Sequence, residues 1–244
     1  MRWDAQVSGW LDDVLAAIRD TGLADLVEAT VADVWERNVD RYDPVVAGDT
    51  ATSLGITASE NIRTLLLRVD RERWAARGVV VTSVQQALVL RIGVRRMLLM
   101  KVADRRLHPE AVDDEDDDEH DWRSGLRWDA ASDVRRLAAE DNARRYEPCV
   151  EDQTGQTWWP GLVPGAPDDP DDPDDPDGLR HLVLVWAGDP VGGTTAGWLG
   201  VPYAGPPGTP PWLAITPVWH HGPGNVPRPR EPIVAVPRAG AGRA

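Results

Sequence analysis

Residues 78–102 of the chain read GVVVTSVQQALVLRIGVRRMLLMKV, and the class of fold follows from this segment. It is rich in β-branched and aliphatic residues, which are typical of strands. Gly93 interrupts it with a residue that suits a tight hairpin turn. The segment therefore predicts three strands, near 79–83, 87–92 and 95–102, that follow one another as an antiparallel meander.

Helices are expected before the meander, because apolar residues recur at spacings of three and four in the first part of the chain. Two helices are predicted on either side of a break at Thr21-Gly22, and a third is predicted to begin at a capping box, Thr57-Ala58-Ser59-Glu60. The residues that form the three apolar stripes are Trp10, Leu11, Val14, Leu15 and Ile18, then Leu26, Val27, Thr30, Val31, Val34 and Trp35, then Ile62, Leu65, Leu66 and Val69.

The helical period returns at 128–146, where Trp128, Ala131, Val134, Leu137 and Ala138 form the apolar side. After that helix, the chain predicts strands again. The run at 181–187 and the segment AGWLGVP at 196–202 predict a hairpin. Residues 212–220 predict an edge strand, because Pro217 cannot donate a hydrogen bond to a neighbouring strand.

The fold class expected from these elements is α+β, with N-terminal helices packed on a small, mainly antiparallel sheet. We expect a single α+β domain over residues 1–221. Acidic low-complexity insertions are expected at 113–121 and 166–178. The Gly/Pro-rich tail at 222–244 is expected to be disordered.

The net charge of −14 comes from two acidic tracts. Residues 113–121 hold eight acids and residues 168–177 hold seven. Without these tracts the numbers of acidic and basic residues are nearly equal, and salt screens the tracts beyond about 8–10 Å. The charge therefore does not exclude nucleic acid as a partner.

Several classes of protein are excluded or disfavoured by composition. Cys149 is the only cysteine, so there is no disulfide framework and no Cys-rich zinc site. No run approaches the ~20 apolar residues of a membrane span, and the N-terminus acquires charge too early for a secretory signal. We therefore expect a cytoplasmic protein without a membrane partner.

No cofactor or metal is expected. The loop GDPVGGTT at 188–195 has the glycines of a phosphate-binding loop, but Thr194 stands where the essential lysine would be, so it predicts a hairpin turn. His220 and His221 are adjacent and face opposite sides of a strand. The tract at 113–121 lacks the glycine and glutamate spacing of an EF-hand. The GxSxG motif of a serine hydrolase is absent.

The predicted core order, helix-strand-strand-strand-helix-strand, resembles that of restriction-endonuclease-like nucleases. This resemblance implies an acid on the second strand and an acid-x-lysine pair on the third, whose carboxylates hold a metal ion. Lys101 and Glu60 fit, and they are the candidate catalytic residues for such an enzyme. However, Leu99 stands in the acid position of the third strand, and residues 87–92 contain no carboxylate. A nuclease core of this type is therefore kept only as an alternative, and it would be a diverged one.

Six basic residues on and after the predicted hairpin form a candidate surface for nucleic acid or a protein partner. They are Arg91, Arg95, Arg96, Lys101, Arg105 and Arg106. The alternative is a charged outward face that keeps the strand soluble. No aromatic residue alternates with the arginines, which disfavours stacking of single-stranded bases.

Two segments resemble an uncharacterised protein family of high-GC actinobacteria. They are RYDPVVAGDTATSLGITASENIR at 41–63 and VWAGDPVGGTTAGWLGVP at 185–202. The resemblance implies a bacterial cytoplasmic setting and assigns no catalytic position.

No reaction has its residues assembled in this sequence, so a non-enzymatic intracellular interaction or regulatory module is the leading hypothesis. A bacterial defence or toxin–antitoxin type system is its candidate setting. A protein partner is expected, with nucleic acid as a second candidate through residues 91–106. The alternative hypothesis is a diverged, metal-dependent nucleic-acid-processing enzyme.

Overall fold

The computed structural model describes residues 5–84, 87–102, 132–146, 150–151, 157–158, 178–205 and 211–221. Four helices come first: α1 (Ala5–Asp20), α2 (Leu23–Val39), α3 (Ala51–Leu66) and α4 (Arg71–Ala75). The predicted meander follows as β1 (Val79–Val84), β2 (Ala87–Ile92) and β3 (Arg95–Lys101). The later elements are α5 (Asp133–Arg145), β4 (Val150–Glu151), β5 (Thr157–Trp158), β6 (His181–Gly188), β7 (Thr195–Pro202) and β8 (Trp212–His221).

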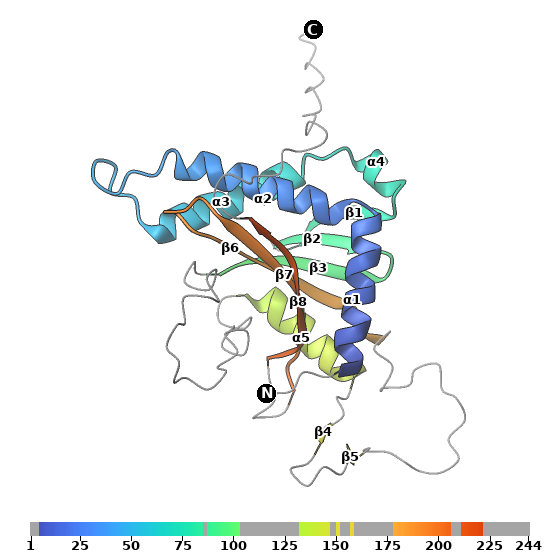
Figure 1. Cartoon of the computed structure of the whole chain (residues 1–244). Helices are drawn as coiled ribbons and strands as arrows, with labels where there is room; N and C mark the ends of the chain where they lie inside the picture. Colours follow the sequence, from blue (N-terminus) through green and yellow to red (C-terminus); the bar gives the residue numbers. More distant parts are fainter. Residues whose placement is uncertain are drawn as a thin grey trace.

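The main sheet has six strands in the order β1-β2-β3-β6-β7-β8. Neighbouring strands are antiparallel except for β3 and β6, which are parallel. The α+β class, the mainly antiparallel sheet and the core order of helix, three strands, helix and strand are thus confirmed (Figure 1). β8 lies at the edge of the sheet, as Pro217 predicted.

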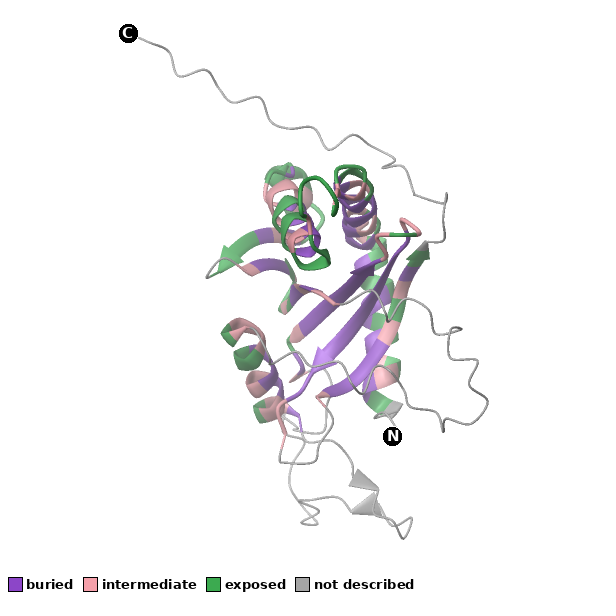
Figure 2. Cartoon of the chain, turned by 90° about the vertical axis from the view of Figure 1, so that its left-hand side faces the viewer, coloured by how far each residue is buried: buried purple, intermediate pink, exposed green. Residues whose placement is uncertain are grey.

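Helices cover both faces of the sheet, and the alternation of strand side chains decides which residues meet which helix. Leu88, Leu90 and Met97 pack with α1, α2 and α3 on one face. Val89 and Leu98 pack toward α5 on the opposite face. Figure 2 shows the buried strands between these two helical layers.

The predicted start of the third helix is wrong. α3 begins at Ala51, because Thr50 and Ser53 form the capping box. The Thr50 hydroxyl accepts a hydrogen bond from the Ser53 amide at 3.0 Å, and the Ser53 hydroxyl accepts one from the Thr50 amide at 2.9 Å. Residues 57–60 lie within the helix, and Val69, predicted on its stripe, lies beyond its end. A short helix, α4, was not predicted.

The start of α5 also differs from the predicted start of that helix. α5 begins at Asp133, and the hydroxyl of its N-cap, Ser132, accepts a hydrogen bond from the Arg135 amide. The predicted residues 128–131 lie outside the described residues.

Other predictions also fall outside the described residues. They concern the insertions at 113–121 and 166–178, the tail at 222–244, and Arg105 and Arg106. The domain boundaries therefore stay a prediction. Of the helices that the structure describes, none combines the length and apolar character needed to cross a membrane.

Candidate functional site

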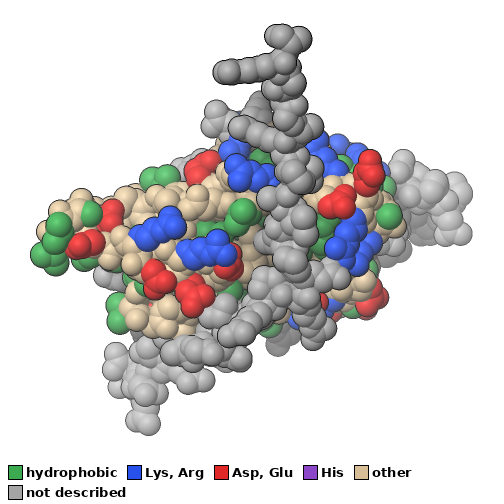
Figure 3. Space-filling view, turned by 90° about the horizontal axis from the view of Figure 1, so that it is seen from above, with side chains coloured by type: hydrophobic (Ala, Val, Ile, Leu, Met, Phe, Trp, Pro, Cys, Tyr) green, Lys and Arg blue, Asp and Glu red, His purple; other side chains and the backbone are tan. Residues whose placement is uncertain are grey.

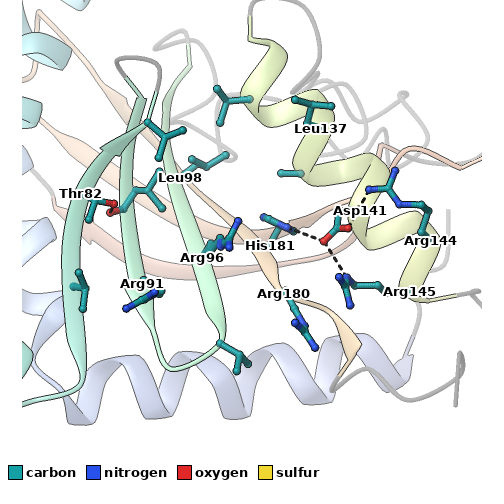
Figure 4. Close-up of a pocket in the computed structure, with 16 residues that line it drawn as sticks. Thr82, Arg91, Arg96, Leu98, Leu137, Asp141, Arg144, Arg145, Arg180 and His181 are labelled. Atoms are coloured by element: carbon teal, nitrogen blue, oxygen red, sulfur yellow. Dashed lines mark hydrogen bonds and ion pairs between the residues drawn. The ribbon is translucent and has the colours of Figure 1, made fainter. Parts of the chain in front are cut away.

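One candidate site is a groove between α5 and the sheet face formed by β1, β2 and β3. Its volume is about 720 Å³. Five arginines and one aspartate line it together with aliphatic side chains (Figure 4). The charged residues are Arg91, Arg96, Arg144, Arg145, Arg180 and Asp141. We call this site the arginine groove.

The register of the sheet places basic side chains in a row across three strands. Arg91 on β2 pairs with Arg96 on β3, and Arg96 pairs with His181 on β6. Side chains directly opposite each other on one face are close, and like charges in such positions destabilise a sheet. The pairing of Arg91 with Arg96 therefore has an electrostatic cost in the free protein.

The guanidinium groups of Arg91, Arg96 and Arg180 have no ion pair or hydrogen bond with the residues that the structure describes. Arg91, Arg96 and Arg180 are all exposed. Arg144 and Arg145 differ, because each forms an ion pair with Asp141, at 3.0 and 2.9 Å. The groove thus contains three cations that no carboxylate of the described residues neutralises.

Asp141 organises the wall of the groove formed by α5. Its carboxylate accepts hydrogen bonds from Arg144 and Arg145 on its own helix and contacts the His181 Nε2 at 3.0 Å. Burial alone would raise the pKa of Asp141, but the hydrogen bonds from Arg145, Arg144 and His181 lower it to about 2. The carboxylate is therefore ionised at neutral pH and holds both arginines along the groove.

His181 adds a hydrogen bond rather than a charge to this site. Burial lowers its pKa, and the positive charges of Arg96 and Arg145 act in the same direction, while Asp141 opposes them. The imidazole is thus neutral at pH 7, with Nε2–H donating to the carboxylate.

Asn142 fixes α5 against the sheet. Its side chain is fully buried. The Nδ2 group donates to the carbonyl oxygens of His181 and Pro202, both at 2.9 Å. Its Oδ1 atom accepts from the amides of Arg180 and His181 at 3.3 and 3.1 Å. One side chain thus satisfies four backbone groups at the ends of β6 and β7.

Of the six basic residues predicted as one surface, the four that the structure describes lie on two different faces of the sheet. Arg91 and Arg96 line the groove. Arg95 faces the other side of the sheet, where its guanidinium lies 5.3 Å from the Trp10 ring centroid on α1. Lys101 also lies on that other side, and Arg105 and Arg106 are outside the described residues. Neighbouring side chains on a strand point to opposite faces of the sheet, so Arg95 and Lys101 are separated from Arg91 and Arg96.

Five residues of this region were not predicted from the sequence: Asp141, Asn142, Arg144, Arg145 and Arg180. Asp141, Arg144, Arg145 and Arg180 line the groove from the end of α5 and the start of β6, and Asn142 is fully buried. One signal was present: Asn142 follows Ala138 by four residues, so it continues the apolar side of the predicted helix. A polar residue at such a position indicates a buried hydrogen-bonding role.

Lys101 and Glu60, the candidate catalytic residues of the nuclease hypothesis, both line a second pocket. This pocket, of about 540 Å³, lies between α3 and the ends of β3 and β6. The Lys101 Nζ lies 5.3 Å from the Trp35 ring centroid and 5.5 Å from that of Trp186. It also donates to the Val102 carbonyl oxygen at 3.2 Å. These contacts hold the ammonium against aromatic rings.

The carboxylates that a nuclease needs are not beside Lys101. Leu99 is half-buried and packs with the core, and the neighbouring strand presents the buried Leu88 and Leu90 on that face. Glu60 is exposed and pairs with Arg63 at 3.1 Å. Within the described part of the chain, no group of three acidic, histidine or cysteine residues is placed to hold a metal ion.

The loop at 188–195 is a hairpin turn, as predicted, and joins the antiparallel strands β6 and β7. The Asp189 carboxylate accepts hydrogen bonds from the amides of Val191 and Gly192, both at 2.8 Å. These amides are therefore already bonded within the turn, whereas a phosphate-binding loop directs its amides at the ligand.

The helical face of the molecule carries charges of both signs. Figure 3 shows arginines and acidic residues interspersed over it. Arg37, for example, pairs with Asp33 at 2.6 Å. The arginine groove differs from this face, because guanidinium groups outnumber carboxylates among the residues that line it.

Comparison of the chain with protein-family models, curated proteins and solved structures finds no match. The resemblance to an actinobacterial family and the bacterial setting stay predictions.

Proposed function

We propose that the protein is a non-enzymatic interaction module that binds a polyanionic partner in the arginine groove. The observation that carries this proposal is the pair Arg91 and Arg96, which face each other on adjacent strands without a carboxylate partner among the described residues. A bound anion is attracted to both guanidinium groups and so offsets the repulsion between them. The bacterial defence or toxin–antitoxin setting stays a prediction.

The chemistry of arginine supports this reading. A guanidinium group presents its N–H donors in a planar fork that matches the two oxygens of a carboxylate or phosphate. Arg91 and Arg96 stand on strands of the sheet, and Asp141 restrains Arg144 and Arg145 on α5. Rigid elements lower the entropy lost on binding, so the groove is organised before the partner arrives.

The test is a paired substitution, Arg91→Ala with Arg96→Ala. We expect at least about tenfold weaker binding of labelled poly-glutamate and of a labelled DNA duplex, measured by fluorescence anisotropy. The salt dependence of binding should become shallower, because fewer counterions are displaced. The melting temperature should not fall, since the substitution removes a repulsive pair.

The matched control is Arg68→Ala with Arg71→Ala, which removes the same charge from the loop after α3 and the start of α4. This variant should bind like the wild type. Equal binding by the Arg91/Arg96 variant and the wild type would overturn the proposal, as would failure of the wild type to bind either polyanion.

A second candidate function is the metal-dependent nuclease with a diverged core, because Lys101 and Glu60 line one pocket. If the leading proposal is right, plasmid DNA and RNA stay intact with Mg²⁺ or Mn²⁺. Cleavage that is lost in both Lys101→Ala and Glu60→Ala, but kept in the control Glu36→Ala, would replace the leading proposal.

A further inference from the structure

The arginine groove has an aliphatic half beside its cationic half. Val89 pairs with Leu98 across β2 and β3, two residues from the row that contains Arg91 and Arg96. Two residues along a strand span about 7 Å, so the two rows are adjacent on one face. Figure 4 shows Leu98 and Leu137 toward one end of the groove and the arginines toward the other.

The groove contains a large share of the exposed aliphatic side chains in the described part of the chain. Seven large hydrophobic residues are exposed in the described part of the chain, and three of them line this groove. They are Val84, Val94 and Leu137, which are 49%, 62% and 50% exposed. A single exposed valine needs no explanation, but a group of them beside unpaired cations indicates a contact surface.

We infer that the partner is an acidic polypeptide segment that carries aliphatic side chains next to its carboxylates. This inference rests on the proposed function and names the class of its partner. Carboxylates of the segment pair with Arg91, Arg96 and Arg180, and its aliphatic side chains cover Val84 and Leu137.

Nucleic acid uses only part of this surface. Phosphates pair with the arginines but gain nothing from valine and leucine. Exposed bases stack on aromatic side chains, and neither tryptophan nor tyrosine is among the residues that line the groove. A polypeptide can use both halves, because acidic and aliphatic side chains occur together in one segment.

The spacing of the rows defines the sequence pattern of the partner. On an extended segment, side chains two residues apart share a face and lie about 7 Å apart, and those four residues apart lie about 14 Å apart. The first distance matches the separation of the arginine row from the buried row of Val89 and Leu98, and the second matches its separation from the exposed Val84, which pairs with Ala87. On a helix, residues three or four apart are similarly close. We therefore expect an acid followed by an aliphatic residue at one of these spacings. Three unpaired guanidinium groups call for a segment with two or three acids.

The test uses two labelled dodecapeptides titrated into the full-length protein. The first repeats aspartate-serine-leucine-serine three times, and the second has serine in place of each leucine. We expect the first to bind about tenfold more tightly, because only it covers apolar surface. A labelled DNA duplex, compared at an equal concentration of anionic groups, should bind more weakly than the first peptide at physiological salt.

Paired variants separate the two halves of the groove. Val84→Ser with Leu137→Ser should remove the advantage of the leucine peptide and leave the serine peptide unchanged. Arg91→Ala with Arg96→Ala should weaken both. The control Val45→Ser with Val191→Ser changes two exposed valines outside the groove and should bind like the wild type.

The outcomes distinguish this inference from the proposed function. If binding depends on the arginines but the two peptides bind equally, or the duplex binds more tightly, the partner class is wrong and the proposed function stands. If the binding of every probe is independent of the arginines, both the inference and the proposed function fail. The same titration on a variant whose eight acids in residues 113–121 are amides removes competition within the chain. If that variant binds neither peptide, the inference is also overturned.

Discussion

Replacing Asn142 with alanine is expected to lower the free energy of unfolding by about 3–5 kcal/mol. The fully buried side chain satisfies four backbone groups of Arg180, His181 and Pro202. Alanine would leave these groups without partners, and each buried polar group without a partner costs about 1–3 kcal/mol. Urea denaturation followed by circular dichroism measures the change.

The matched control is Asn61→Ala on α3, where an exposed asparagine donates one hydrogen bond, to Asn38 at 3.2 Å. Its cost should be smaller, about 1 kcal/mol, because one acceptor instead of four backbone groups loses its partner. A similar loss for Asn61 and Asn142 would contradict our account of how α5 is held. Because α5 forms one wall of the arginine groove, the Asn142 variant should also bind acidic probes more weakly at temperatures where it remains folded.

The second large effect is expected at Trp35, whose replacement with alanine should cost about 3–5 kcal/mol. Trp35 is 1% exposed and meets Trp186 edge to face, with ring centroids 5.9 Å apart. Its Nε1 donates to the Asp189 carbonyl oxygen at 3.1 Å. Alanine would leave a cavity where α2 meets the end of β6, and the Asp189 carbonyl would keep only the hydrogen bond from the Gly193 amide at 3.0 Å. Denaturation under the same conditions measures the cost.

The control for Trp35 is Trp74→Ala on α4, a partly exposed tryptophan whose ring lies 5.2 Å from the Arg77 guanidinium. This change should cost about 1 kcal/mol, the value of an exposed cation–π contact with some apolar burial. Glycine supports the contrast: a Cβ atom added at Gly188 would lie 2.4 Å from the Trp35 ring, so the backbone of β6 is packed directly against that ring. Equal costs at the two tryptophans would refute this account.

The sheet could largely be predicted from the sequence, because its signals are local. The apolar segment at 78–102 with a turn at Gly93 gave all three strands of the meander, and Pro217 gave the edge position of β8. The start of α3 could not be predicted as reliably as the strands. Two capping pairs, Thr50 with Ser53 and Thr57 with Glu60, stand seven residues apart, and only packing decides between them.

The candidate site was predicted only in part. The core order placed Lys101 and Glu60 at one pocket, since both lie on elements that the order fixes. The pairing of Arg91 with Arg96 also follows from a hairpin that turns at Gly93, and alternation separates Arg95 from Arg96. The contributions of Arg144 and Arg180 depend on how α5 packs against β6, which no local pattern in the sequence specifies.

The single parallel pair, β3 with β6, has a consequence for how the chain reaches its native state. The strands on each side of that pair form hairpins with neighbours close in sequence, whereas β3 and β6 meet only when the long connection from Lys101 to His181 closes. Contacts of low sequence separation form faster, so the union of the two half-sheets is expected to limit the rate of folding. The entropy of closing a flexible loop rises by only about 0.6 kcal/mol for each doubling of its length. Insertions into this connection outside α5 are therefore expected to have little effect on the equilibrium.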